Sequence, residues 1–392
     1  MRYMLINSLP IAVHSLGYFT LVLLVIELGS LILLRLSRLR AIASKELSRA
    51  DFINPFFKTS DSYTVHDTWR QHYYKEINEL FTNTANQASN KWRSLGLWCA
   101  RRYHGKCINI DKYNLRRSIS PLDRNSKQDN KLSIHFFGGS AVWGWEVRDE
   151  NTIPSKILHF RNDVTVENHG QLGYVSSQSV MAFTQRIKYE PKPNLVIFID
   201  GLNDIYSAYQ SGIAGIEQNA ISIQQRFESK SLEKTTEFYL KKSNFINLIR
   251  AVFHTRKKNI GDVARNNDLL AHAIITAYNQ NISLASKIAA AYNIKALFIW
   301  LPTLFGKPNL TEYEHKLFDM ISSFKPLYSS VKKLITLDNL LSPQVINLSN
   351  IFYQNKEPIY VDPWHYNEHA NHLIAEKING AITLIMQKHQ LD

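Results

Sequence analysis

Short apolar runs alternate with longer amphipathic segments over the part of the chain that begins at Leu132. The runs that predict β-strands lie at 132–137, 164–167, 195–199, 296–301 and 345–348. The segments that predict α-helices lie at 152–161, 176–189, 268–292, 311–335 and 366–388. This alternation is typical of a parallel sheet with helices on both faces, in which functional groups collect at the carboxyl ends of the strands. We therefore predict an α/β fold.

The pattern near the N-terminus is different, because residues 11–34 are almost continuously apolar, with interruptions at His14 and Glu27. At about 1.5 Å per residue, a helix of this length would extend about 36 Å, which is enough to cross a hydrocarbon core of about 30 Å. The run ends in arginines rather than in a small-residue cleavage site. We therefore predict an uncleaved transmembrane helix.

These patterns divide the chain into an anchor (1–45), a neck (46–130) and a main domain (131–392). The neck mixes aromatic and polar residues. It predicts helices at 66–82 and 88–103 and ends in a polar linker over 118–131. Residues 205–265 fit no sheet element, and we interpret them as an insertion near the site.

The composition narrows the possible partners. The chain has 46 Lys and Arg against 33 Asp and Glu, a formal net charge of +13. A basic surface favours polyanions, anionic lipids or acidic glycans, although an ordinary solvated surface explains scattered charges equally well. No zinc pattern, helix-turn-helix signal or aromatic RNA-binding motif is present, so we predict no nucleic-acid partner.

Cys99 and Cys107 are the only two cysteines, which excludes a disulfide-rich scaffold and a cysteine-only zinc site. They are compatible with one local disulfide or with two reduced, partly buried side chains, and the sequence favours neither.

Features of the sequence point to opposite membrane sides for the main domain. One basic residue, Arg2, precedes the apolar run, whereas several follow it, namely Arg35, Arg38, Arg40, Lys45 and Arg49. The positive-inside rule would therefore place the domain in the cytoplasm. The possible disulfide and the family resemblance given below favour the other side. We predict a single-pass membrane protein with an extracytoplasmic domain.

Four short motifs carry candidate chemistry. Gly-Gly-Ser at 138–140 follows the first strand, where a serine at the start of a helix meets amide groups that favour negative charge. Gly173 and Asn203 follow the next two strands and suit an oxyanion hole, with one backbone and one side-chain donor. Asp-Pro-Trp-His at 362–365 places a carboxylate three positions before a histidine that it can orient. Taken singly, each motif has an ordinary structural explanation, such as a helix cap or a polar turn.

A metal site is the alternative for the last motif, because His365, His369 and His372 recur at helical spacing. No matching acidic cluster accompanies these histidines. We therefore predict no metal.

In this order, the four motifs resemble the blocks of the SGNH/GDSL hydrolases, which supply Ser, Gly, Asn and His. The resemblance covers 132–387 and departs from the family at Gly139, where the family has Asp, and at Ala141, where it has Leu. The neck also resembles bacterial membrane-anchored members over 105–111 and at Arg116 and Arg117. The resemblance implies a three-layer α/β/α, flavodoxin-like fold behind the membrane helix.

The resemblance also implies acyl transfer through a covalent serine intermediate, without a metal or an organic cofactor. Ser140 would be the nucleophile, His365 the general base and Asp362 the residue that orients the imidazole. The N–H groups of Ser140 and Gly173 and the side chain of Asn203 would hold the oxyanion.

Three tryptophans near these motifs are candidate substrate-binding residues, namely Trp143, Trp145 and Trp364. Core packing explains them equally well. The leading function is ester hydrolysis, by an esterase or deacetylase acting on an acylated glycan or lipid near the membrane. The same residues would serve an O-acyltransferase that modifies a cell-surface polysaccharide. An inactive glycan-binding or assembly protein is the third hypothesis.

Overall fold

The computed structural model describes residues 18–33, 35, 68–82, 90–93, 95–120, 131–221, 223–224, 244 and 266–388. The chain forms two compact units, one made of 1–55 with 221–259 and the other of 56–220 with 260–392. The second unit contains the described part of the neck, the sheet and all four motifs.

A five-stranded sheet lies at the centre of the second unit, with strand order β6-β5-β7-β8-β9. Every neighbouring pair in it is parallel. Its strands are β5 (Leu132–Gly138), β6 (Val164–Asn168), β7 (Leu195–Asp200), β8 (Lys295–Trp300) and β9 (Val345–Asn347). Each begins and ends within one residue of the bounds predicted from the sequence, so these five strand predictions are confirmed.

Successive residues of the strands alternate between two separate hydrophobic cores. On β7, for example, Ile197 and Ile199 belong to one core and Val196 and Phe198 to the other. All six residues of β7 are buried, as expected for a parallel strand that is covered on both faces. The molecule therefore has the three-layer α/β/α fold that the pattern predicted.

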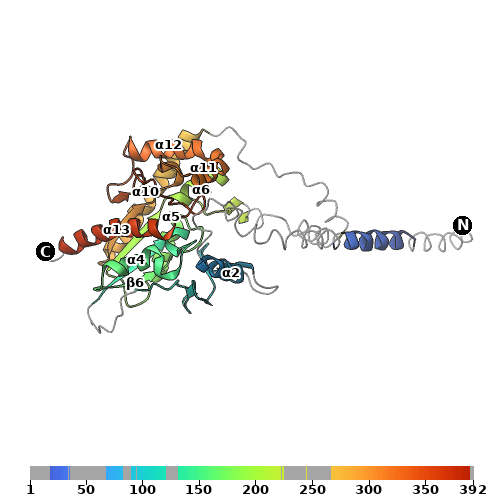
Figure 1. Cartoon of the computed structure of the whole chain (residues 1–392), viewed down its shortest axis with the longest axis horizontal. Helices are drawn as coiled ribbons and strands as arrows, with labels where there is room; N and C mark the ends of the chain where they lie inside the picture. Colours follow the sequence, from blue (N-terminus) through green and yellow to red (C-terminus); the bar gives the residue numbers. More distant parts are fainter. Residues whose placement is uncertain are drawn as a thin grey trace, which may run out of the picture. The chain divides into compact units, whose positions relative to one another are not determined.

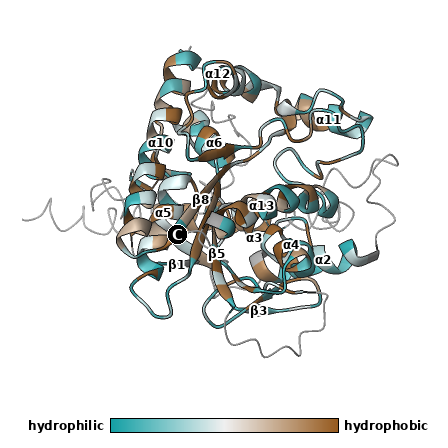
Figure 2. Cartoon of the chain, turned by 90° about the vertical axis from the view of Figure 1, so that its left-hand side faces the viewer, coloured by the Kyte–Doolittle hydropathy of each residue, from teal (hydrophilic) through white to brown (hydrophobic). Residues whose placement is uncertain are grey.

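Helices cover both faces of this sheet. Figure 2 shows α4 (Ile153–Phe160) and α13 (Glu368–Lys388) on one side of the strands, and α5 (Ser176–Arg186) and α10 (Asn267–Ala291) on the other. Figure 1 shows α13 running beside α4. The remaining helices are α2 (Thr68–Thr82), α3 (Ser140–Trp143), α6 (Leu202–Ser211), α11 (Glu312–Met320) and α12 (Lys325–Thr336).

Two sequence predictions differ from the structure. The single helix expected over 311–335 is broken between α11 and α12, because Pro326 at the start of α12 cannot continue a preceding helix. The helix expected over 88–103 is wrong. That segment forms the antiparallel strands β1 (Asn90–Trp92) and β2 (Trp98–Ala100), followed by β3 (Tyr103–His104), which pairs with β4 (Asn109–Ile110).

The turn between β1 and β2 explains the second error. Leu95 and Gly96 both have a positive φ, of 65° and 70°, which a right-handed helix does not allow. The aromatic residues of the flanking segments favour strands. The two cysteines, Cys99 and Cys107, are buried in this region and both have free thiols.

Residues 18–33 are helical, and many of their large apolar side chains are exposed. Among the described residues, none of the helices combines the length and apolar character that a bilayer crossing requires. The predicted transmembrane helix over 11–34 therefore has no support from the described part of the chain, and residues 11–17 and 34 lie outside it. Most of the predicted insertion and residues 121–130 of the linker also lie outside the described residues.

A buried ion pair holds the segment that leads to the last motif. Glu314 on α11 accepts hydrogen bonds from the backbone N–H groups of Ile359 and Tyr360, at 2.9 and 3.1 Å. Lys307 forms an ion pair with the same carboxylate, and both side chains are fully buried. A buried charge is tolerated only with such partners, so the pair fixes the backbone just ahead of residues 362–365.

We predict that Lys307→Met lowers the free energy of unfolding by about 3–5 kcal/mol, because it leaves the Glu314 carboxylate buried without its cation. Urea unfolding measures this loss. Lys316→Met is the matched control, since Lys316 pairs with Glu312 on the surface of the same helix. It should change stability by less than about 1 kcal/mol. Equal losses in the two variants would contradict the argument.

Candidate active site

Ser140, His365 and Asp362 lie within hydrogen-bond distance of one another, although the serine and the histidine are 225 residues apart in the chain. The Ser140 hydroxyl is 2.7 Å from His365 Nε2. His365 Nδ1 is 2.7 Å from one Asp362 oxygen and 2.9 Å from the other. The structure thus brings together the three residues that the first and last motifs singled out. A hydroxyl bound to an imidazole that a carboxylate orients is arranged for nucleophilic attack.

Asp362 is fixed by its own backbone as well as by the imidazole. Its Oδ1 accepts hydrogen bonds from the N–H groups of Trp364 and His365, at 2.7 and 2.8 Å. Burial by itself would raise the pKa of this carboxyl, but the neighbouring His365 and these hydrogen bonds lower the pKa below its usual value. Asp362 therefore stays ionised and favours a positively charged imidazole beside it.

Ser140 is the first residue of α3, directly after β5. The turn between the two elements is tight, because a Cβ on Gly138 would lie 2.3 Å from the backbone oxygen of Ile199. Gly144 ends α3 after one turn in a left-handed conformation, with φ of 92°. These two glycines set the position of the helix that begins at Ser140; Gly138 belongs to the glycine turn singled out in the sequence, whereas Gly144 does not.

Asn203 lies beside the serine turn. Its Nδ2 donates to the Tyr174 carbonyl at 2.8 Å, and a Cβ added to Gly139 would lie 2.3 Å from the same nitrogen. The amide therefore packs directly against the residue before Ser140. Gly173, next to Tyr174 in the chain, has a left-handed φ of 75°. Within the described residues, the structure shows no hydrogen bond from the N–H groups of Gly173 or Ser140.

A side chain at position 139 would occupy the place of the Asn203 amide. The glycine at this position therefore allows the serine turn and the Asn203 turn to approach each other closely.

Asp204 holds the turn that carries Asn203. It accepts hydrogen bonds from the N–H and the hydroxyl of Ser176, at the start of α5, and from the Gly201 N–H. Burial raises the pKa of Asp204 to about 6. Nothing in the sequence indicates that this aspartate is buried, because an Asn-Asp turn is equally compatible with the surface.

The three tryptophans have different surroundings. Trp143 is fully buried and packs under the Arg116 guanidinium, 4.4 Å from its ring centroid, so it belongs to the core rather than to a binding surface. Trp145 is partly buried, with its ring centroid 5.9 Å from that of His365. Trp364 packs on Tyr206, with ring centroids 5.0 Å apart. Trp364 also packs on Phe324, with ring centroids 5.4 Å apart. Of the three, only Trp145 has a ring contact with His365 among the described residues.

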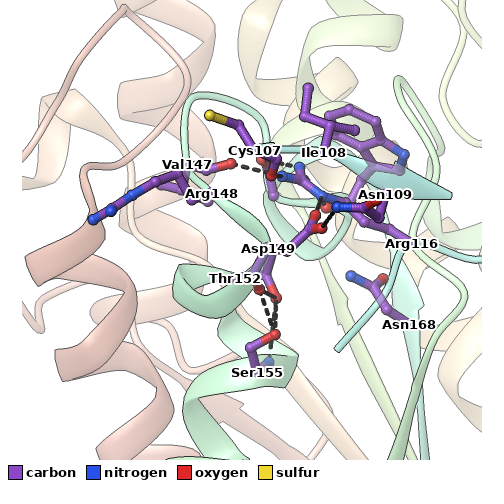
Figure 3. Close-up of polar contacts among 12 residues, drawn as sticks. Cys107, Ile108, Asn109, Arg116, Val147, Arg148, Asp149, Thr152, Ser155 and Asn168 are labelled. Atoms are coloured by element: carbon purple, nitrogen blue, oxygen red, sulfur yellow. Dashed lines mark hydrogen bonds and ion pairs between the residues drawn. The ribbon is translucent and has the colours of Figure 1, made fainter. Parts of the chain in front are cut away.

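Arg116 is a site-supporting residue whose role the sequence did not reveal. Figure 3 shows its guanidinium pointing into the loop that follows α3. It is 2.8 Å from Asp149 Oδ1, and it donates to backbone carbonyls of that loop, those of Trp143, Gly144 and Val147. Arg116 is fully buried, so its charge and hydrogen bonds are satisfied inside the protein. The neck segment thus fixes the loop that follows the helix of Ser140.

The three histidines of the alternative metal site, His365, His369 and His372, do not form a group of metal ligands in the described part of the chain. Both ring nitrogens of His365 already contact Ser140 and Asp362, and His369 and His372 lie on α13. A different set of residues, His135, Glu167 and His169, has possible ligand atoms within 4.8 Å of one another.

That group is joined by direct contacts. Glu167 Oε2 is 2.8 Å from His169 Nε2 and 3.2 Å from His135 Nε2. The Arg186 guanidinium lies 3.5 Å from the same oxygen, and a second cation there would be repelled. We interpret the group as a polar contact between β5 and β6.

No family model and no curated protein matches the chain. Several solved structures do. A lipolytic protein of the G-D-S-L family from Veillonella parvula is 14% identical, with a TM-score of 0.34 over 64% of this chain and 98% of its own. A GDSL-like lipase from Bacteroides thetaiotaomicron is 14% identical, with a TM-score of 0.32 over 67% and 93%. A psychrotrophic esterase from Pseudoalteromonas sp. is 12% identical, with a TM-score of 0.33 over 66% and 100%. The first two of these proteins are described by the name of the family whose motifs the four motifs of this chain resemble.

We predict that Gly139→Ala lowers the turnover of an activated ester such as p-nitrophenyl acetate by about 10²–10³-fold, because the new methyl group displaces the Asn203 amide. Steady-state kinetics measures the loss. Gly380→Ala is the control, since a Cβ at that helical position would meet nothing within 4 Å. Unchanged turnover in Gly139→Ala would show that the position of Asn203 does not matter.

Proposed function

We propose that this chain is a serine hydrolase of the SGNH/GDSL type, which cleaves ester bonds through an acyl-enzyme on Ser140. The observation that carries the proposal is the 2.7 Å distance between Ser140 Oγ and His365 Nε2, with Asp362 on the other side of the imidazole. This geometry supplies a nucleophile, a base and a group that orients the base, which ester hydrolysis requires.

In the first half of the reaction, His365 takes the proton of the Ser140 hydroxyl while Oγ attacks the carbonyl carbon of the ester. The negative charge moves to the carbonyl oxygen, where the N–H groups of Ser140 and Gly173 and the amide of Asn203 stabilise it. The C–O bond to the alcohol then breaks, and the protonated His365 gives its proton to the departing oxygen. The product is an acyl-Ser140 ester.

In the second half, His365 takes a proton from water while the water oxygen attacks the acyl carbon. The C–O bond to Ser140 then breaks, His365 returns the proton to Ser140 Oγ, and a carboxylic acid leaves. A sugar hydroxyl in place of water would yield a new ester by the same steps. The O-acyltransferase alternative therefore uses the same residues and differs only in the acceptor.

The proposed substrate is an acylated glycan or lipid. The aromatic ring of Trp145 beside His365 supports it, because sugar rings and acyl chains pack on such faces. The net charge of +13 suits a substrate or surface that carries anionic groups. Attachment to a membrane and an extracytoplasmic location remain predictions.

Ester hydrolysis by the full chain tests the proposal. With p-nitrophenyl acetate, Ser140→Ala should reduce turnover to background, and Asp362→Asn should lower kcat by about 10⁴-fold because the imidazole loses its orienting carboxylate. Asp163→Asn is the control, since Asp163 is a partly exposed carboxylate paired with Arg161. Full turnover in Ser140→Ala would refute the assignment. Adding an acetylated polysaccharide and an acceptor glycan, with product analysis, separates hydrolysis from transfer.

A further inference from the structure

Helix α2 of the neck contacts the loop that follows the nucleophile helix, and it does so through Glu146. The Tyr74 hydroxyl donates to the Glu146 carboxylate, and the Glu146 N–H donates to the Tyr73 hydroxyl at 2.6 Å. The Arg70 guanidinium lies 3.7 Å from the same carboxylate, and the side chains of both residues are only 4% exposed. Three residues of one helix therefore hold a single buried glutamate.

The backbone of Glu146 is held in an uncommon conformation. Its φ is +67°, a left-handed value that costs a residue other than glycine free energy and persists only where the surroundings impose it. Glu146 follows Trp145, whose ring lies beside the His365 ring. The contacts of α2 with Glu146 therefore hold the backbone directly after Trp145.

A second link runs from α2 to the other side of the site. The Arg148 guanidinium lies 4.8 Å from the centroid of the Trp69 ring on α2. The same guanidinium binds Glu368 through two hydrogen bonds, of 2.9 and 2.7 Å. Glu368 begins α13, three residues after His365. Helix α2 is thus connected both to the loop after Ser140 and to the helix after His365.

The neck holds α2 itself through a buried carboxylate. Glu76 accepts hydrogen bonds from the backbone N–H groups of Lys106, Cys107 and Ile108, at 2.6, 3.0 and 2.9 Å. A Cβ on Gly105 would lie 2.4 Å from this carboxylate, so the close approach requires a glycine. The neck motif at 105–111 therefore fixes the helix that contacts Glu146.

Glu146 and Asp362 are two buried carboxylates that interact with one imidazole. Burial, and then repulsion by Asp362, raise the pKa of Glu146 to about 7. The groups that face Glu146 are Arg70, Tyr73 and Tyr74 from α2, and Asp362 and His365 from the segment after residue 361. Because Asp362 stays ionised, the variable charge beside the imidazole at neutral pH is that of Glu146.

We propose that Glu146 is a positioning residue of the Ser140 site, and that helix α2 completes this site by holding the Glu146 carboxylate and, with it, Trp145 against His365. The inference rests on the proposed serine nucleophile, and it assigns a role to a neck that the hydrolase motifs do not include. Glu146 acts through His365 and does not touch the reacting atoms.

The test is the pH dependence of Ser140 labelling by a fluorophosphonate in the full chain, followed by mass spectrometry. Glu146→Gln removes a negative charge near the imidazole, so the acidic limb of the labelling rate should move to lower pH. Tyr74→Phe removes a hydrogen bond that stabilises the ionised Glu146 and should move the limb in the same direction by less. Glu312→Gln, an exposed glutamate on α11, is the matched control and should leave the limb in place.

Glu146→Gly separates the charge from the backbone, because glycine adopts a φ of +67° readily while it removes the carboxylate. It should show the same shift as Glu146→Gln. A Ser140 labelling profile identical to wild type in the folded Glu146 variants would overturn this inference alone, as would a uniform loss of rate with no shift. Wild-type labelling that persists in Ser140→Ala would instead overturn the nucleophile assignment, and this inference with it.

Discussion

The hydrogen bond between Ser140 and His365 depends on two segments that meet only because the sheet is parallel and covered on both faces. Ser140 follows β5 at the carboxyl end of a buried strand, and His365 precedes α13, which packs on the same core as α4. Parallel strands place their carboxyl ends at one edge, so residues far apart in sequence converge there. A single motif therefore does not predict the site, whereas the four motifs together do.

Convergence alone would not fix the side chains to within a hydrogen bond, and buried charged groups supply the remaining constraint. Each of four buried charged side chains binds the backbone of a loop near the site; they are Glu76, Arg116, Asp204 and Glu314. A buried charge that loses such partners is costly, so each one couples the stability of the fold to the geometry of a loop. Two of the four belong to the neck, and one of these, Arg116, binds the loop that follows the helix of Ser140.

Most of the sheet could be predicted from the sequence, because parallel strands are short apolar runs with sharp ends. The serine, asparagine and histidine motifs could be predicted for a related reason, since each follows a predicted strand or matches an ordered family block. Arg116 and Glu146 could not, because a single charged residue in a sequence carries no information about its burial. The pattern of the neck predicts a helix where the structure has strands. The turn between these strands requires a positive φ at Leu95 and Gly96, and the spacing of apolar residues does not indicate backbone conformation.

The central claim is that Ser140 attacks a carbonyl whose oxygen is held by Gly173 and Asn203. The most direct measurement is a crystal structure of the protein after reaction with a phosphonate that mimics the tetrahedral intermediate. The account predicts a covalent bond from Ser140 Oγ to phosphorus. One phosphonyl oxygen should lie within about 3.1 Å of the Ser140 N–H, the Gly173 N–H and the Asn203 amide. An adduct on another residue, or a phosphonyl oxygen that points away from Gly173 and Asn203, would contradict it.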